Sequence, residues 1–316
     1  MRLLSFALVV ALVASAVVVA ENFAVRAYFP HLSRLNTDFS DAYLQRELQG
    51  MAASPPQVIF LGDSVLWGFR LKAQQTAVAL LSAKRCRCIN LSFKSSSPPN
   101  YYALTKLLLH YGVRPQVVVL EIDQRVLNQA NSAYRTLHPA LAELAAPLLS
   151  SNDRKILGLS SKGDNFKDRL ARLASAAFPV YAMRADLRET LAPPPDAVAP
   201  QHPTAAMFLG EYDLSPLTDA NVGVRYLEKT ADALRAARIP TVAFMTPTNH
   251  ALLHDYIDGP EYRYNLIFLR HALERRGVSV VDLDRAFPAG DFYDYAHLKA
   301  SAQTRLANIL EKELPR

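Results

Sequence analysis

The sequence has few cysteines, no clustered positive charge and no internal repeat. Its two cysteines, Cys86 and Cys88, have no histidine at a metal-ligand spacing beside them, and the eight histidines are scattered, so we expect no metal site. The formal net charge is +6, but the basic residues are dispersed and do not alternate with aromatic residues. This distribution is typical of a solvated surface and argues against nucleic acid as a partner.

The two cysteines are separated by one residue on a predicted strand. This spacing points both side chains to one face, about 6–7 Å apart at Cα, where a disulfide would be strained. We therefore expect two buried, apolar cysteines.

Charge is also absent from Leu3 to Ala20, a stretch of 18 residues rich in Val, Ala and Leu. That length suits one membrane-spanning helix, since about 20 residues are typical. The small residues up to Ala20 also resemble the site at which a secretory signal is cleaved. We expect an uncleaved anchor in the cell membrane. A cleaved signal, which would leave a periplasmic or secreted protein, is the alternative, and a buried helix of the globular domain is the third reading. The first two readings place everything after residue 20 outside the cytoplasm, with 21–56 as a linker and N-terminal helix.

Half of the residues are hydrophobic, and the remainder of the chain alternates between two patterns. Short, nearly continuous Val- and Ile-rich runs predict buried strands at Gln57–Leu61, Cys86–Leu91, Pro115–Ile122, Ile239–Met245 and Val278–Leu283. Helical patterns occupy Leu71–Lys84, Tyr101–Tyr111, Asn221–Ala237, Tyr262–Arg276 and about Lys299–Leu314. This rhythm predicts an α/β fold, a three-layer parallel sheet of about five strands spanning 57–316, with its ligand crevice at the carboxyl ends of the strands.

One long segment, at about 128–218, interrupts this rhythm after the third strand. It contains no convincing strand, and its Pro-rich part from Leu191 to Pro203 is typical of a loop. An amphipathic pattern at Asn165–Ala177 indicates helix. We expect a helical insertion that covers the crevice.

Two motifs fall at the same edge of the predicted sheet. Ser64 follows the first strand within Gly-Asp-Ser, where its backbone N–H would begin a helix and help to hold a developing oxyanion. Asp294 and His297 follow the last strand, three residues apart, so the carboxylate can orient the imidazole while Nε2 accepts a proton from Ser64. Either motif alone is weak, because a D-x-x-H before a helix can be a simple cap.

These residues resemble the SGNH/GDSL hydrolase superfamily. The blocks "FLGDSVLWG" (Phe60–Gly68) and "DYAHL" (Asp294–Leu298) carry the resemblance, which spans roughly 57–310. It implies a flavodoxin-like sheet, Ser64 as nucleophile, His297 as base with Asp294 as its partner, and no metal or organic cofactor.

The middle blocks depart from the superfamily pattern. Such proteins usually carry an oxyanion-binding glycine after the second strand and an asparagine after the third. This chain has "INLSFKSSSPPNY" and "LEIDQRVLN" instead. Ser95 or Ser96 through a backbone N–H, and Arg125 or Asn128 through a side chain, are the candidate donors.

With the N-terminal anchor, these departures are similar to a membrane-anchored, extracytoplasmic subgroup, which includes accessory acyltransferases of alginate O-acetylation and teichoic-acid D-alanylation. The resemblance implies an acyl-ester hydrolase or O-acyltransferase for an acylated carbohydrate or cell-envelope polymer. It also implies a multi-spanning membrane acyltransferase as partner. The triad cannot separate hydrolysis from transfer. A catalytically silent, glycan-binding envelope protein is the alternative, favoured by the altered oxyanion blocks.

Two further features have an alternative structural interpretation. Thr246, Asn249 and His250 follow the fourth strand and would lie at the pocket rim or in a plain connecting loop. Trp67 would line the acyl site or pack beneath the insertion.

Overall fold

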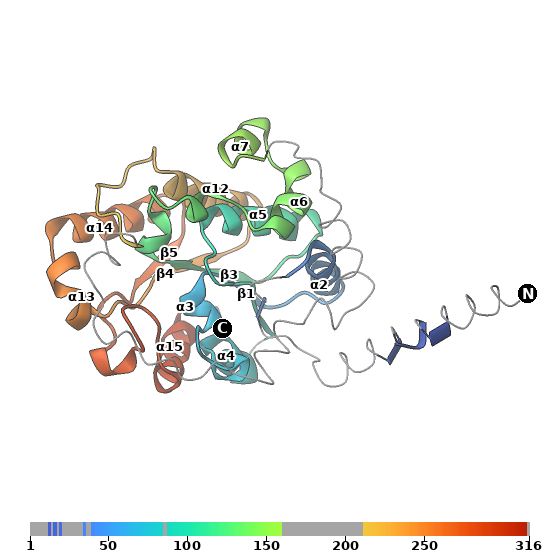
Figure 1. Cartoon of the computed structure of the whole chain (residues 1–316), viewed down its shortest axis with the longest axis horizontal. Helices are drawn as coiled ribbons and strands as arrows, with labels where there is room; N and C mark the ends of the chain where they lie inside the picture. The colour runs from blue at the N-terminus through green and yellow to red at the C-terminus, as the bar shows by residue number, and fades with distance from the viewer. Residues whose placement is uncertain are drawn as a thin grey trace, which may run out of the picture.

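The computed structural model describes residues 12, 13, 15–17, 19, 20, 34, 35, 39–84, 87–159 and 211–314 (Figure 1). Five strands form one parallel sheet in the order β2-β1-β3-β4-β5. The strands are β1 (Val58–Leu61), β2 (Cys88–Asn90), β3 (Val117–Ile122), β4 (Thr241–Met245) and β5 (Ser279–Asp282). Each lies within a run that the sequence predicts, and the α/β, three-layer fold is confirmed.

Alternation along the strands divides the core between the two faces of the sheet. Ile59 and Leu61 pack in a cluster with the helices on one face, which are α5 (Pro98–His110), α12 (Val222–Ala236) and α14 (Pro260–Glu274). Val58 and Phe60 pack in a second cluster with α4 (Ala77–Lys84) and α15 (Ala300–Glu313). Figure 1 shows the two sets of helices on opposite sides of the strands.

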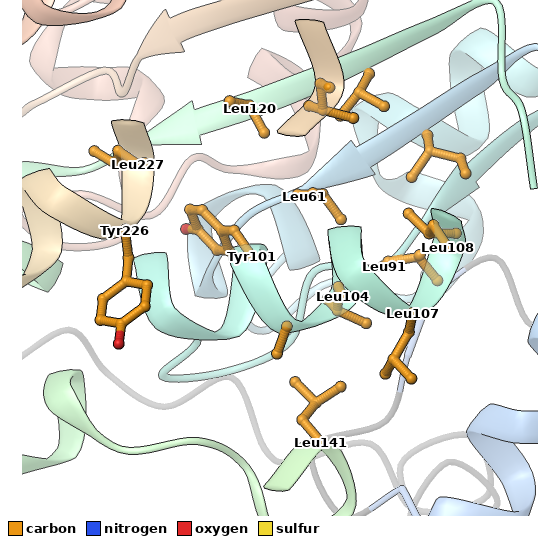
Figure 2. Packing of buried hydrophobic residues seen from close by; sticks show 14 of the residues in the cluster. Leu61, Leu91, Tyr101, Leu104, Leu107, Leu108, Leu120, Leu141, Tyr226 and Leu227 are labelled. Atoms are coloured by element: carbon orange, nitrogen blue, oxygen red, sulfur yellow. The ribbon is translucent and has the colours of Figure 1, made fainter. Parts of the chain in front are cut away.

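The central helix α5 packs against the sheet on one side and a further helix on the other. Its Leu104 and Leu108 lie near Leu61 of β1, and Leu141 of α6 (Pro139–Ala145) approaches α5 from the side away from the sheet (Figure 2). Prolines at the first positions of α5 favour its start there, since their fixed φ suits the first turn. This packing makes α5 and α6 part of one continuous core.

Other helices connect or cover these elements. They are α2 (Asp41–Ala53), α3 (Ser64–Trp67), α7 (Ser151–Ile156) and α13 (His250–Ile257), with short 3₁₀ turns at Ala73–Gln75, Gln124–Leu127, Ser132–Arg135, Ala146–Leu148 and Ala289–Asp291. The sequence does not predict α13. Within the expected insertion, α6 and α7 are helical, whereas the predicted helix at Asn165–Ala177 and the loop at Leu191–Pro203 lie outside the described residues.

Two expectations are corrected. Cys88 is disulfide-bonded, and the only other cysteine in the chain is Cys86, which lies outside the described residues. The prediction of free cysteines assumed that both stand on the strand, but β2 begins at Cys88. In addition, β5 is not covered on both faces, because it is an edge strand with residues that are exposed or half-buried.

Within the described part of the chain, none of the helices combines the length and the apolar character needed to cross a bilayer. Most of the apolar segment from Leu3 to Ala20 lies outside the described residues. The anchor therefore stays a prediction.

Candidate active site

The turn that carries the candidate nucleophile Ser64, called the nucleophile turn below, follows directly from the end of β1. Helix α3 begins at Ser64, and Asp63 precedes it as the N-cap, with its Oδ1 accepting the Val65 N–H at 2.8 Å. Gly68 ends this single turn with φ of 84°, a left-handed conformation that favours glycine. The turn thus presents Ser64, which is partly exposed, at the carboxyl edge of the sheet.

The structure brings Ser64, His297 and Asp294 together. Ser64 Oγ lies 2.8 Å from His297 Nε2. His297 Nδ1 lies 2.8 Å from Asp294 Oδ2 and 3.0 Å from Asp294 Oδ1. This arrangement favours the tautomer with the proton on Nδ1, which leaves Nε2 free to accept the serine proton.

The Asp294 carboxylate is held in its charged form. Burial by itself would raise its pKa, but the hydrogen bond from His297 and the backbone N–H groups of Ala296 and His297 outweigh that effect and bring the pKa to about 2. Asp294 therefore carries a full negative charge at any pH at which the protein would work.

The loop after β4 supports the loop that carries Asp294. Asn249 donates its side-chain amide to the Asp294 carbonyl at 3.0 Å and its backbone N–H to the Tyr295 carbonyl at 3.0 Å. Its Oδ1 also accepts the Leu252 N–H as the cap of α13. Of the three residues expected at the pocket rim, Asn249 is thus the one that contacts the loop carrying Asp294 and His297.

The other two rim residues are bound elsewhere. His250 contacts the carboxylates of Asp284 at 2.7 Å and Asp258 at 3.2 Å. Thr246 is buried, and its N–H donates to the Ile122 carbonyl. These contacts tie the β4–α13 loop to the sheet and to the end of β5.

Beneath the nucleophile turn lies a fully buried carboxyl group that the sequence reasoning missed. Glu121 Oε2 accepts the N–H groups of Asp63 at 2.8 Å and Leu66 at 3.2 Å. From the second strand, Asn90 donates to the Leu66 carbonyl at 3.1 Å. The available signal was the acidic residue that interrupts the apolar run of β3.

Three buried carboxylates meet at this place. Asp63, Glu121 and Asp123 each bring an oxygen within 4.8 Å of the others. That spacing would suit a cation, and the chain itself supplies one, because the Arg125 guanidinium binds Asp123 and lies 3.5 Å from Asp63. We therefore interpret the group as an internal ion-pair cluster.

The four predicted oxyanion donors, Arg125, Asn128, Ser95 and Ser96, differ in burial and in their hydrogen-bond partners. Arg125 is buried in that ion-pair cluster, and Asn128 donates to the Glu211 carbonyl and accepts the Ala130 N–H, contacts that do not lead to Ser64. Ser95 is exposed and adopts φ of 59°, the region that favours glycine. Ser96 is buried, and its hydroxyl has no partner among the described residues.

Aromatic rings surround the histidine. The Phe69 ring is 4.6 Å from the His297 ring and the Tyr295 ring is 6.4 Å away, and both side chains are half-buried. Trp67 does not line the site, because it is 2 % exposed, donates to the Leu35 carbonyl and packs under the Arg34 guanidinium. Its alternative interpretation as a packing residue fits these contacts.

Another buried polar group near the end of β3 was also missed. Both amide atoms of Gln124 lack a hydrogen-bond partner among the described residues, and the side chain is 4 % exposed. Its position, immediately after Asp123, puts it on the edge of the sheet that carries Ser64.

Comparisons with known proteins give distant likenesses. A family model matches residues 219–316, less than half of the chain, and this region includes Asp294 and His297. No curated protein matches the sequence.

Among solved structures, a putative lipolytic protein of the G-D-S-L family from Desulfitobacterium hafniense is 9% identical with a TM-score of 0.43, covering 81% of this chain and 97% of that one. A family two carbohydrate esterase from Clostridium thermocellum is 12% identical with a TM-score of 0.33, covering 82% and 64%. A gut microbial diltiazem-metabolizing enzyme is 9% identical with a TM-score of 0.35, covering 82% and 46%. Because all three TM-scores lie below 0.5, we base the function on the residues of this chain.

Proposed function

We propose that this protein is a serine-dependent acyl-ester hydrolase or O-acyltransferase that works through an acyl-serine intermediate. The observation that carries the proposal is the hydrogen-bonded chain from Ser64 Oγ through His297 to Asp294, with distances of 2.8 Å at both links. A nucleophile, a base and an orienting carboxylate in this order are the parts that acyl transfer to serine requires.

In the first step, Ser64 Oγ attacks the carbonyl carbon of an ester while its proton passes to His297 Nε2. The tetrahedral intermediate collapses, the ester C–O bond breaks, and the leaving alcohol takes the proton from His297. Water or a second hydroxyl group then loses its proton to His297 and attacks the acyl-serine. The acyl C–Oγ bond breaks, His297 returns the proton to Ser64 Oγ, and the acid or the new ester is released. The negatively charged Asp294 stabilises the imidazolium in both steps.

The backbone at Ser64 and Ser95 supplies candidate oxyanion donors. In the described part of the chain, neither N–H has a hydrogen-bond acceptor. Lys94, beside Ser95, lies 5.6 Å from the Phe69 ring, which in turn packs on His297. The side chain of Lys94 in the 93–96 loop therefore approaches the ring that packs on His297, which supports an oxyanion donor in this loop.

We propose an acylated carbohydrate of the cell envelope as the substrate class, with the domain outside the cytoplasm. The half-buried rings of Phe69 and Tyr295 offer apolar faces against which a sugar ring can pack beside the base. The disulfide at Cys88 fits an oxidising compartment. A multi-spanning membrane acyltransferase is the proposed partner in the transfer reaction, and neighbouring genes are the direct test of that pairing.

The test is labelling of the purified full-length protein with a serine-reactive fluorophosphonate, together with turnover of a chromogenic acetyl ester. We expect labelling that maps to Ser64 and disappears in Ser64→Ala, while the thermal unfolding midpoint changes little. Ser82, an exposed residue in the last turn of α4, which leads to the start of β2, provides the matched control Ser82→Ala.

A chain that binds envelope glycan but is never labelled would instead favour the catalytically silent binding protein. Full ester turnover in Ser64→Ala would remove the nucleophile assignment. Addition of an acceptor sugar separates the two reactions, because a transferase moves the acyl group to the sugar in preference to water.

A further inference from the structure

An acidic residue interrupts the central strand of the sheet on the face that carries the nucleophile turn. Glu121 follows Val117 and Val119 on the side of β3 that faces α3, and its side chain is fully buried. Burial of a carboxyl group is unfavourable unless hydrogen bonds compensate. Among the described residues, Glu121 makes its two hydrogen bonds through Oε2 to the backbone of the nucleophile turn, and its Oε1 has no partner.

The backbone N–H groups at the start of α3 have no partners within the helix, as at every helix N-terminus. Glu121 Oε2 accepts those of Asp63 and Leu66, and Asp63 Oδ1 accepts that of Val65. Within the described residues, the Ser64 N–H is the one left without an acceptor in this set. The two carboxyl groups therefore hold three N–H groups of the turn and leave the Ser64 N–H available.

The position of Glu121 explains why the first residue of Gly-Asp-Ser, Gly62, is a glycine. A Cβ at Gly62 would lie 2.2 Å from Glu121 Oε2, too close for any side chain. The register of β1 and β3 places Gly62 next to Glu121, since Leu61 pairs with Leu120. Glycine at this position lets the carboxyl group reach the turn.

From these contacts, and given the proposed nucleophile Ser64, we propose that Glu121 is the positioning residue of the nucleophile turn. It acts as a neutral, two-fold acceptor that aims the Ser64 N–H and hydroxyl at the acyl carbonyl.

The charges around Glu121 explain why it would work in its neutral form. Burial raises the pKa of Glu121 well above its usual range, and the nearby carboxylates of Asp63 and Asp123 raise it further. Arg125 forms ion pairs with Asp63 and Asp123 and not with Glu121. The buried hydroxyl of Tyr101 on α5 also lies near these carboxyl groups, and it has no hydrogen-bond partner among the described residues. A proton on Glu121 removes a negative charge from behind the turn, where it would oppose the oxyanion.

Two substitutions of the full-length protein separate position from charge. Glu121→Gln keeps the reach and both acceptor bonds but cannot ionise. Glu121→Asp keeps a carboxyl group, but the side chain is one methylene group shorter and the carboxyl group no longer reaches the two N–H groups. We expect Glu121→Gln to lose at most about threefold, and Glu121→Asp about 100-fold, in the rate of fluorophosphonate labelling, the latter being the size of effect seen when one oxyanion donor is removed. The matched control is Glu228→Asp, which shortens a buried carboxyl on α12 that pairs with Arg276 and should leave labelling unchanged.

A second readout tests the neutral state. Because the pKa of Glu121 is raised in the fold, its protonated form is favoured there, whereas in the unfolded chain it ionises like an ordinary glutamate. The wild type should therefore lose stability relative to Glu121→Gln as pH rises. The unfolding midpoint of Glu121→Gln should therefore exceed that of the wild type by more at pH 8 than at pH 5. A pH-independent difference would overturn the neutral acceptor.

Equal labelling of the two Glu121 variants, faster labelling of Glu121→Asp, or a Glu121→Gln protein that does not fold would each overturn the proposal. Failure of the proposed function is visible separately, because the wild type would then not be labelled, or Ser64→Ala would be labelled as strongly as the wild type.

Discussion

The side-chain amide of Asn249, at the start of α13, donates to the backbone carbonyl of Asp294 across 3.0 Å. This bond links the loop after β4 to the loop that carries the proposed orienting acid and the base. In the described part of the chain Asn249 makes no hydrogen bond to Ser64, so its effect on the chemistry would pass through the position of Asp294.

Asn249→Ala should therefore lower kcat about tenfold with little change in KM, because the triad loop loses one of its supports. Steady-state kinetics with the acetyl ester measure both constants. Asn265→Ala is the matched control, since Asn265 is also a buried asparagine and its side chain hydrogen-bonds the backbone of Ser215 and Leu217. An equal fall in kcat in both variants would assign Asn249 a purely structural role.

Removal of the base should be more harmful than removal of the charge on its partner. In His297→Ala no group remains to accept the Ser64 proton, whereas Asp294→Asn leaves a poorly oriented imidazole. We expect Asp294→Asn to retain at least about tenfold more turnover than His297→Ala. Equal turnover in the two variants would show that Asp294 contributes as much as the base itself.

Turnover should fall on acidification, because a protonated imidazole cannot accept the serine proton. Asp294, with a pKa of about 2, stays charged throughout this range and cannot cause the fall. The measurement is kcat/KM between pH 5 and pH 9. A flat profile would count against a histidine base and leave the fold unaffected.

The low pKa of Asp294 also predicts a contribution to stability. Its carboxylate is preferred in the fold, so the stabilisation is present above the ordinary value of 3.8 and is lost as pH falls toward about 2. The difference corresponds to about 2 kcal/mol. The free energy of unfolding of the wild type minus that of Asp294→Asn should accordingly shrink between pH 5 and pH 2, as measured by urea denaturation. A constant difference would mean that Asp294 has the same pKa in both states.

The apolar segment from Leu3 to Ala20 should hold the protein in a membrane. We expect the full-length chain to sediment with membranes and to resist carbonate extraction, and a chain that begins at Glu21 to stay in the supernatant. A mature protein whose first residue is Glu21 would instead establish cleavage. A domain digested by protease only after cell lysis, and protected in spheroplasts, would place it in the cytoplasm and contradict the envelope substrate.

The strands and the residues of the proposed triad could be predicted from the sequence because their signals are local. Each strand is a short apolar run, and Ser64 and His297 stand in motifs just after the first and last of these runs. Sequence order in an alternating α/β chain then suffices to place both at the same edge of the sheet.

The supporting residues could not be predicted, because their roles depend on pairing across the sheet. Glu121 lies beside Gly62 because of the register of β1 and β3, which the sequence does not show. Asn249 has only the pattern of a loop residue in the sequence, and its role depends on the bond to the loop that carries Asp294. The position of Arg125 after β3 predicts an oxyanion donor, yet two buried carboxylates bind its guanidinium. Helix α13 was missed because it is short and follows a proline-containing turn.

Ser64 and His297 are 233 positions apart in the chain, although their side chains touch. A chain of which only the first four strands have been synthesised or translocated would contain Ser64 but not His297. Without the base, it would not react with esters. His297 lies between β5 and α15, which packs against α4, so the base would reach its position only when this last part of the chain has folded. In a protein that crosses a membrane unfolded, this order of assembly would delay reactivity until the whole domain has arrived in its final compartment.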